Sequence, residues 1–380
     1  MRLSPLTLLA AALAAVLAPL SARAQVGKPI VHTSQKYTAS ASLKARVWCV
    51  PEGTVDREAV KPKSSNVTFV GREPLALCTA PAQGSVAPGR IPLSTVVGVD
   101  FEIDYDRFEV AKAMARSEWP KAITILRKAY TPYFMYLDVP ENNVLEGSFD
   151  LGVTMFKCAR SSMRKAATEE ERAAALQQYS SAYDVFTACS KAKWSSFGPL
   201  AQIRALHCMV LIDSEKARRA SRMLAAMEEP IPGDDTYGYY WLLKAELAKL
   251  DGNVTNELDA AVKSVSFENK DVETFPDALM LSAECYEKIG NPYRARDVYF
   301  EVAKLFPKTD WAADALARLE TLMASGATRK AEETTAESTF FGLEEDMNEL
   351  ADGLVLMNKN AGTIFDYDDE EESAVTDTDK

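Results

Sequence analysis

The chain has 380 residues, of which 47% are hydrophobic, so it is long enough for two domains with cores of their own. Its net charge is -12, but residues 331–380 contain 16 acidic and 2 basic residues, whereas residues 25–330 contain 39 of each. An electroneutral body lacks the basic surface that attracts nucleic acid or an anionic membrane, so neither is an expected partner.

Residues 1–24 are typical of a secretory signal peptide. A basic start at Arg2 precedes an apolar run from Leu3 to Leu20, and Ala22-Arg23-Ala24 matches a cleavage site with small residues. A retained membrane anchor fits less well, because the run is short and Pro19 interrupts it. We expect export to the bacterial periplasm, with full secretion as the alternative.

Residues 25–104 predict a small β-rich module. Short runs such as "KARVWCV" and "NVTFVG" are rich in Val, Phe, Trp and Thr, and clusters of Pro, Gly and Ser separate them. We expect the segment before Leu43 to be flexible.

The six cysteines predict disulfides, because an exported protein meets an oxidising compartment. The expected pairs are Cys49 with Cys78 and Cys158 with Cys189. For Cys208 and Cys285, burial as free thiols is an equal alternative. No CxxC motif is present and the only histidines are His32 and His207, so we expect no metal site.

Residues 105–325 predict an all-α array. Apolar residues recur there at spacings of three and four, and short turns interrupt them without intervening strands. Helix, turn and helix in succession favour an α-solenoid of about four helical hairpins between Arg107 and Ala324.

The stretch from Leu279 to Pro307 contains the most regular unit of this array. It contains small residues, aromatics, a turn glycine and a final proline at defined intervals. These residues are Leu279, Ala283, Tyr286, Gly290, Ala295, Tyr299, Val302 and Pro307. With Val302 in place of the usual alanine, this pattern resembles the tetratricopeptide repeat (TPR) family. The preceding unit is similar at Trp241, Ala245 and Gly252, but Glu257 stands where the family has alanine.

The resemblance implies a protein that binds a segment of a partner on the concave face formed by the first helix of each hairpin. In these two units the residues at the face positions are Tyr239, Leu242, Glu246, Lys249, Asp277, Met280, Glu284 and Glu287, and in the unit before them they are Gln202 and Leu206. For the aromatics Tyr239 and Trp241, filling space between helices is the alternative role.

No motif for nucleophilic, phosphate-binding, zinc or dinucleotide chemistry is present, and we expect no cofactor. His207 falls inside a predicted helix, where we expect a structural role. Residues 326–380 predict a disordered acidic tail, with a short amphipathic helix over residues 340–357. The sequence therefore favours a non-enzymatic interaction scaffold of the cell envelope. The alternative is an enzyme, or an enzyme subunit, with its site in the β module.

Overall fold

A computed structural model describes residues 37–56, 59–81, 89–266 and 274–325 of the chain. The expected signal peptide, the expected acidic tail and His32 lie outside the described residues. Within them, no helix is long and apolar enough to cross a membrane.

The chain divides into two compact units. The first contains the described residues up to Pro230 together with Asp234–Tyr239, and the second contains Ile231–Gly233 and the described residues from Tyr240 onward. Each unit is described by itself.

The first unit begins with an antiparallel sheet of five strands in the order β4-β3-β2-β1-β5. The strands are β1 (Tyr37–Cys49), β2 (Lys63–Glu73), β3 (Ala76–Thr79), β4 (Gly89–Pro92) and β5 (Val96–Phe101), with the 3-10 turn η1 (Leu93–Thr95) before β5. Leu43, Ala45 and Val47 are buried on β1, whereas Lys44 and Arg46 between them are exposed. This alternation gives the sheet one apolar face.

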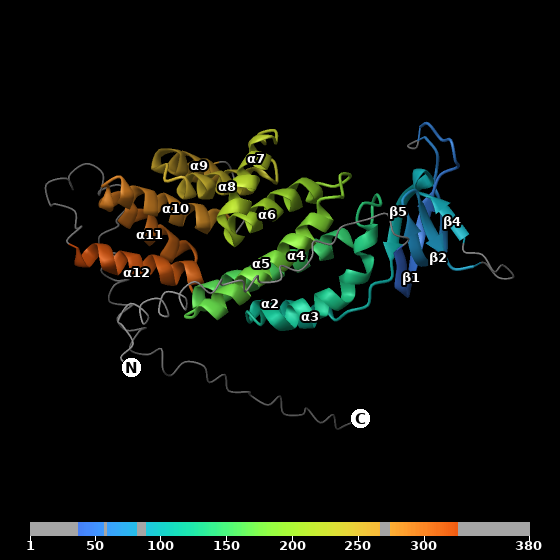
Figure 1. The fold of residues 1–380 in the computed structure, drawn as a ribbon, viewed down its shortest axis with the longest axis horizontal. Coiled ribbons are helices and arrows are strands. Elements are labelled where there is room, and N and C mark those ends of the chain that lie inside the picture. Colours follow the sequence, from blue (N-terminus) through green and yellow to red (C-terminus); the bar gives the residue numbers. More distant parts are fainter. Residues whose placement is uncertain (1–36, 57–58, 82–88, 267–273, 326–380) are drawn as a thin grey trace, which may run out of the picture. The chain divides into compact units, whose positions relative to one another are not determined.

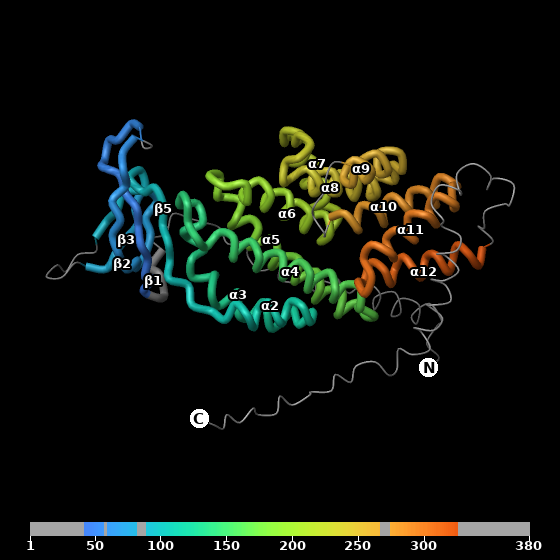
Figure 2. The backbone as a smooth tube through the Cα atoms, turned by 180° about the vertical axis from the view of Figure 1, so that it is seen from behind, coloured from blue at the N-terminus to red at the C-terminus, as the bar shows by residue number. Residues whose placement is uncertain are grey.

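The helices of the first unit follow the sheet along the chain (Figure 1). They are α2 (Arg107–Ala115), α3 (Trp119–Tyr130), the 3-10 segment η2 (Thr131–Tyr136), α4 (Leu145–Lys165), α5 (Glu169–Cys189), α6 (Phe197–Ile212) and α7 (Ser214–Ala225). Helices α4 and α5 lie side by side in both ribbon and tube views and pack against each other (Figure 2).

The segment η2 covers the apolar face of the sheet. Tyr136 is fully buried, and its ring lies 5.4 Å from that of Phe69 and 5.2 Å from that of Phe101, measured between centroids. Arg72 on β2 donates to the carboxylate of Asp138 and to the backbone oxygen of Met135. Sheet and helices therefore share one core, although the sequence predicted separate domains divided at residue 104.

The second unit continues the pairing of helices. It contains α9 (Val254–Ser266), α10 (Thr274–Lys288), α11 (Pro292–Leu305), α12 (Asp310–Ala324) and most of α8 (Tyr237–Leu250). In chain order, the described helices from α2 to α11 follow one another as five helix-turn-helix units, one more than the approximately four predicted, and α12 follows the last of them. The predicted fold class, mainly α helical hairpins after a small β module, is confirmed.

Both predicted disulfides are wrong, because none of the six cysteines is joined to another by a disulfide. In the sheet, Cys49 of β1 lies opposite Lys63 of β2, and Cys78 of β3 lies opposite Gly71 of β2. Because Lys63 and Gly71 are eight residues apart on β2, the two cysteines lie about 26 Å apart along that strand. Gly152 of α4 lies opposite Phe186 of α5. Cys158 is six residues beyond Gly152 toward one end of the hairpin, and Cys189 is three residues beyond Phe186 toward the other end. Their separation along the helix axes is about 13 Å, too far for a disulfide.

Candidate functional site

The hairpin of α10 and α11 places the repeat residues as the sequence predicted. Ala283, Ala295, Tyr299 and Val302 are fully buried in one apolar cluster that joins α10, α11 and α12. Gly290 in the turn has φ +78°, a conformation that strains residues with a side chain. The small alanines therefore let two helices approach closely, and the glycine reverses the chain between them.

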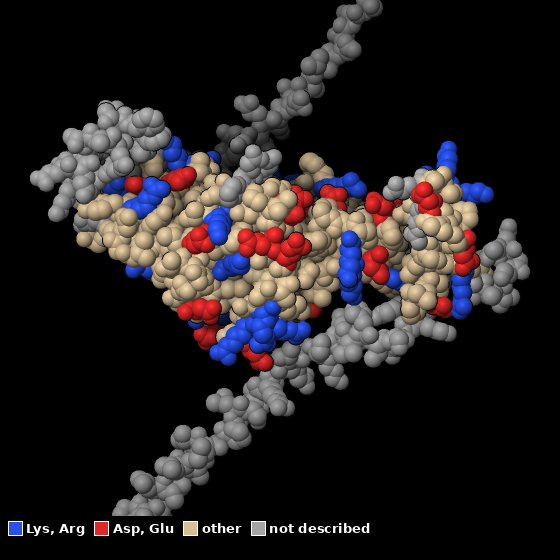
Figure 3. Space-filling view, turned by 90° about the horizontal axis from the view of Figure 1, so that it is seen from above, with Lys and Arg blue, Asp and Glu red and all other residues tan. Residues whose placement is uncertain are grey.

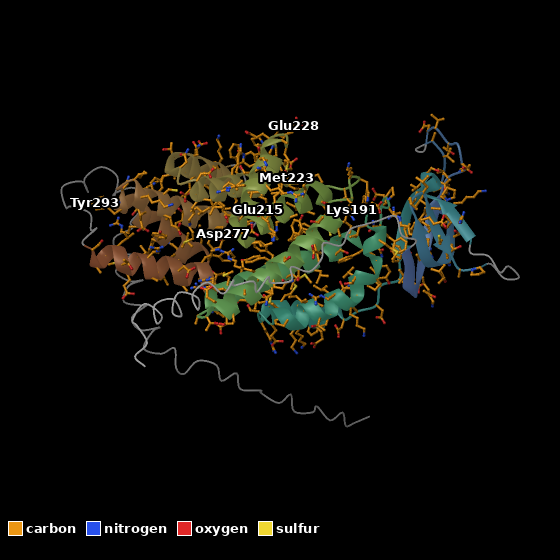
Figure 4. All side chains as sticks on the ribbon, in the orientation of Figure 1. Lys191, Glu215, Met223, Glu228, Asp277 and Tyr293 are labelled. Carbon is orange, nitrogen blue, oxygen red and sulfur yellow. The ribbon has the colours of Figure 1, made fainter. Side chains whose placement is uncertain are left out.

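One row of side chains on α10 remains accessible beside this core. Asp277, Met280, Glu284 and Glu287 recur at intervals of three and four residues, and all four are half-buried. Met280 packs against the edge of the apolar cluster. Asp277, labelled in Figure 4, accepts a hydrogen bond of 2.7 Å from the indole nitrogen of Trp311 on α12.

An ion pair and a hydrogen bond hold two of these side chains in place. Lys249 at the end of α8 forms an ion pair with Glu284, so α8 and α10 contribute to the same surface. Glu287 accepts a hydrogen bond of 2.5 Å from the hydroxyl of Tyr299 on α11. We call the surface formed by Glu246, Lys249, Asp277, Met280, Glu284 and Glu287 the α8–α10 face.

Two of the predicted binding residues do not belong to this surface. Tyr239 is 8% exposed and Leu242 is 1% exposed, so the prediction that they contact a partner is wrong. The ring of Tyr239 lies 4.8 Å from the guanidinium carbon of Arg204, which is itself buried. The alternative role in the core therefore applies to Tyr239, because aromatics at helical spacing fill the space between helices.

Glu257, the departure from the repeat pattern, forms an ion pair that sequence analysis missed. Its side chain is 1% exposed, and both carboxylate oxygens accept hydrogen bonds from Nζ of Lys288, at 2.8 and 3.0 Å. Burial disfavours the charge on Lys288, but the hydrogen bond and charge of Glu257 outweigh it and raise the pKa of Lys288. Burial and the nearby Glu257 raise the pKa of the Cys285 thiol to about 12. Because that thiol stays protonated at neutral pH, it is a poor nucleophile.

His207 lies in the core, as predicted. It is 5% exposed, and the centre of its ring lies 5.0 Å from that of the Phe156 ring, with the two planes tilted by 52°. Among the described residues, no group of three or more His, Cys, Asp and Glu side chains could hold a metal ion.

Comparison with known proteins finds similarity at the level of structure. No protein-family model matches the chain, and no curated protein matches it either. Among solved structures, a thermophilic TPR protein of Thermus thermophilus is similar, with 14% sequence identity and a TM-score of 0.27. The alignment covers 57% of this chain and 95% of that one. The succession of helical hairpins is established by the helices of the chain itself.

Proposed function

We propose that the protein is a non-enzymatic interaction scaffold of the bacterial cell envelope and binds a segment of a partner protein on the α8–α10 face. The observation that carries the proposal is Met280, half-buried at the edge of a packed core and surrounded by charged side chains. A flexible thioether in such a place adapts to apolar side chains of different shape.

The charges of the face indicate the chemistry of the partner segment. Four carboxylates, those of Glu246, Asp277, Glu284 and Glu287, accompany one ammonium group, that of Lys249. Complementary charge favours encounter and specificity. We therefore expect a segment with an apolar side chain for Met280 and lysine or arginine next to it.

Photo-crosslinking tests the face directly. A photoreactive amino acid at position 280 is expected to form an adduct with one envelope protein in intact cells. The same group at Met323 on α12, which is 48% exposed, is the matched control and is expected to give no such adduct. Identical adducts from both positions, or none from position 280, would contradict the proposal.

A synthetic peptide of the crosslinked segment then measures affinity. Met280→Asp is expected to weaken binding at least tenfold, because an apolar contact becomes a carboxylate among carboxylates. Met323→Asp is expected to leave the affinity unchanged. Equal affinity for both variants would place the binding surface elsewhere.

The envelope location has its own test. We expect protein from the periplasmic fraction to begin at Gln25. Protein recovered from the cytoplasm with residues 1–24 intact would contradict export.

A further inference from the structure

A pocket of about 400 Å³ opens in the first unit, whereas the residues of the α8–α10 face belong to the second. It lies where the end of β5 meets the end of α3 and the first turns of α2, α4 and α6. Pockets of this volume hold small ligands or a few residues of a chain.

Aromatic and aliphatic side chains form much of the pocket. Phe101, Tyr130 and Leu145 are buried, and Trp194 and Phe197 are half-buried. A Cβ atom on Gly147 would lie 2.0 Å from the ring of Tyr130, so the glycine allows this ring to pack against α4. Such a wall favours an apolar group.

The two asparagines in the pocket shape it and are already engaged. The side chain of Asn143 bonds both backbone groups of Phe101, at 2.8 and 2.9 Å, and so covers the outer edge of β5. The amide nitrogen of Asn142 donates to three backbone oxygens, and its oxygen accepts from the nitrogen of Val144. Selectivity for a ligand must therefore come from the charged groups.

Arg107, the first residue of α2, is the cation of the pocket. It is exposed, forms no ion pair with any other described residue, and lies 5.7 Å from the centre of the Tyr105 ring. A guanidinium remains charged at every physiological pH and binds carboxylates through two parallel hydrogen bonds. Helix α4 also begins at the pocket, and no side chain caps its first turn. Both features favour an anion.

Glu146 in the first turn of α4 is the remaining charged group. It is exposed, and within the described part of the chain it has no ion pair or hydrogen bond to another side chain. Its carboxylate can accept a hydrogen bond from an N–H group of a ligand.

We propose that this pocket binds a ligand the size of one or two amino-acid residues. The ligand combines an apolar side chain with a carboxylate and a neighbouring N–H group. Arg107 binds the carboxylate, the aromatic wall packs against the apolar side chain, and Glu146 accepts from the N–H group. Two sources present this chemistry: the C-terminal residue of a polypeptide, and a free N-acylated amino acid. The proposal does not depend on the α8–α10 face, because the pocket belongs to the other unit.

Calorimetric titration of the full chain tests the proposal with three probes: N-acetyl-phenylalanine, its C-terminal amide, and acetyl-Ala-Ala-Phe with a free carboxylate. We expect the acid to bind at least tenfold more tightly than its amide. Arg107→Gln is expected to remove this difference. Arg116→Gln, an exposed arginine at the other end of α2, is the matched control and is expected to preserve it.

The comparison of acid with amide needs no variant, so it does not depend on how Arg107→Gln folds. Tighter binding of the tripeptide would identify a polypeptide C-terminus as the ligand, whereas equal binding would identify a free small carboxylate. Either result supports the shared chemistry. Equal affinity for acid and amide, no binding of any probe at millimolar concentration, or the same loss in Arg116→Gln would overturn the proposal.

Discussion

At the scale of single residues, Glu257 shows how a departure from a repeat pattern is accommodated. A buried carboxylate is costly unless it is paired and hydrogen-bonded. Lys288 supplies both the charge and the hydrogen bonds, and it reaches α9 from the last residue of α10. The alanine usual at this position is thus replaced by a polar contact between consecutive helices.

Lys288→Met is expected to destabilise the protein by about 2 kcal/mol, because it leaves the Glu257 carboxylate buried without its partner. The cost is below that of a fully buried pair because Lys288 is 38% exposed and partly screened by water. The double variant Glu257→Ala with Lys288→Met is expected to recover more than half of the loss. Urea denaturation measures both, with Lys121→Met, from an exposed pair, as a control that changes little.

The same ion pair predicts a pH dependence. The pKa of Lys288 is raised in the folded protein, so its stabilisation is fully present below the unfolded pKa of about 10.4 and is lost as the pH rises through the folded pKa. The difference in unfolding free energy between wild type and Lys288→Met should be constant from about pH 8 to 10 and shrink above it. A difference that grows with alkaline pH would contradict the pairing.

Ala283→Leu tests the close approach of α10 to its neighbours. Ala283 is fully buried, and overpacking a tight contact costs on the order of 1 to 3 kcal/mol. Thermal unfolding followed by circular dichroism should show a clear decrease in the melting temperature. Ala313→Leu, at an exposed position of α12, is the control, and equal melting curves for both variants would show that the helices are not in close contact.

At the scale of elements, helix boundaries follow from local chemistry. Helix α5 begins with a capping box, in which the Thr168 hydroxyl accepts from the backbone nitrogen of Glu171 and the Glu171 carboxylate accepts from that of Thr168. The turn before it is short, because α4 continues to Lys165.

Thr168→Ala is expected to reduce the stability by about 1 kcal/mol, since it removes the acceptor for one first-turn N–H group. Denaturation in urea measures the change. Ser181→Ala, inside the same helix, is the control, because its hydroxyl bonds only to the oxygen of Gln177 in the preceding turn. An effect of Ser181→Ala as large as that of Thr168→Ala would show that the cap is not the cause.

At the scale of the whole molecule, acidic and basic side chains are interspersed on the face shown in Figure 3, as expected for an electroneutral body. The first unit combines the sheet with helices in one core. The apolar face of the sheet is completed by Tyr133 and Tyr136, which lie beyond the boundary that the sequence predicted.

A fragment of residues 25–104 is therefore expected to remain unfolded, because its strands would expose Phe69 and Phe101 to water. Proton NMR spectra of the fragment should lack the dispersion typical of a folded sheet. A well-dispersed spectrum would support the independent module that the sequence predicted.

The sequence by itself determined the order of elements, the change from strands to helices between Phe101 and Arg107, and the hairpin of α10 and α11. These features follow from periodicity and from residues such as Gly290 and Ala283, whose effects are local. Only the tertiary structure decided that Tyr239 and Leu242 are buried, that Cys49 and Cys78 are far apart, and that Glu257 meets Lys288. Burial, strand register and ion pairing depend on contacts between residues distant in the chain. The periodicity of apolar residues along a helix or a strand does not specify such contacts. For the same reason the pocket at Arg107 has no sequence signal, since its walls come from five separate elements brought together by folding.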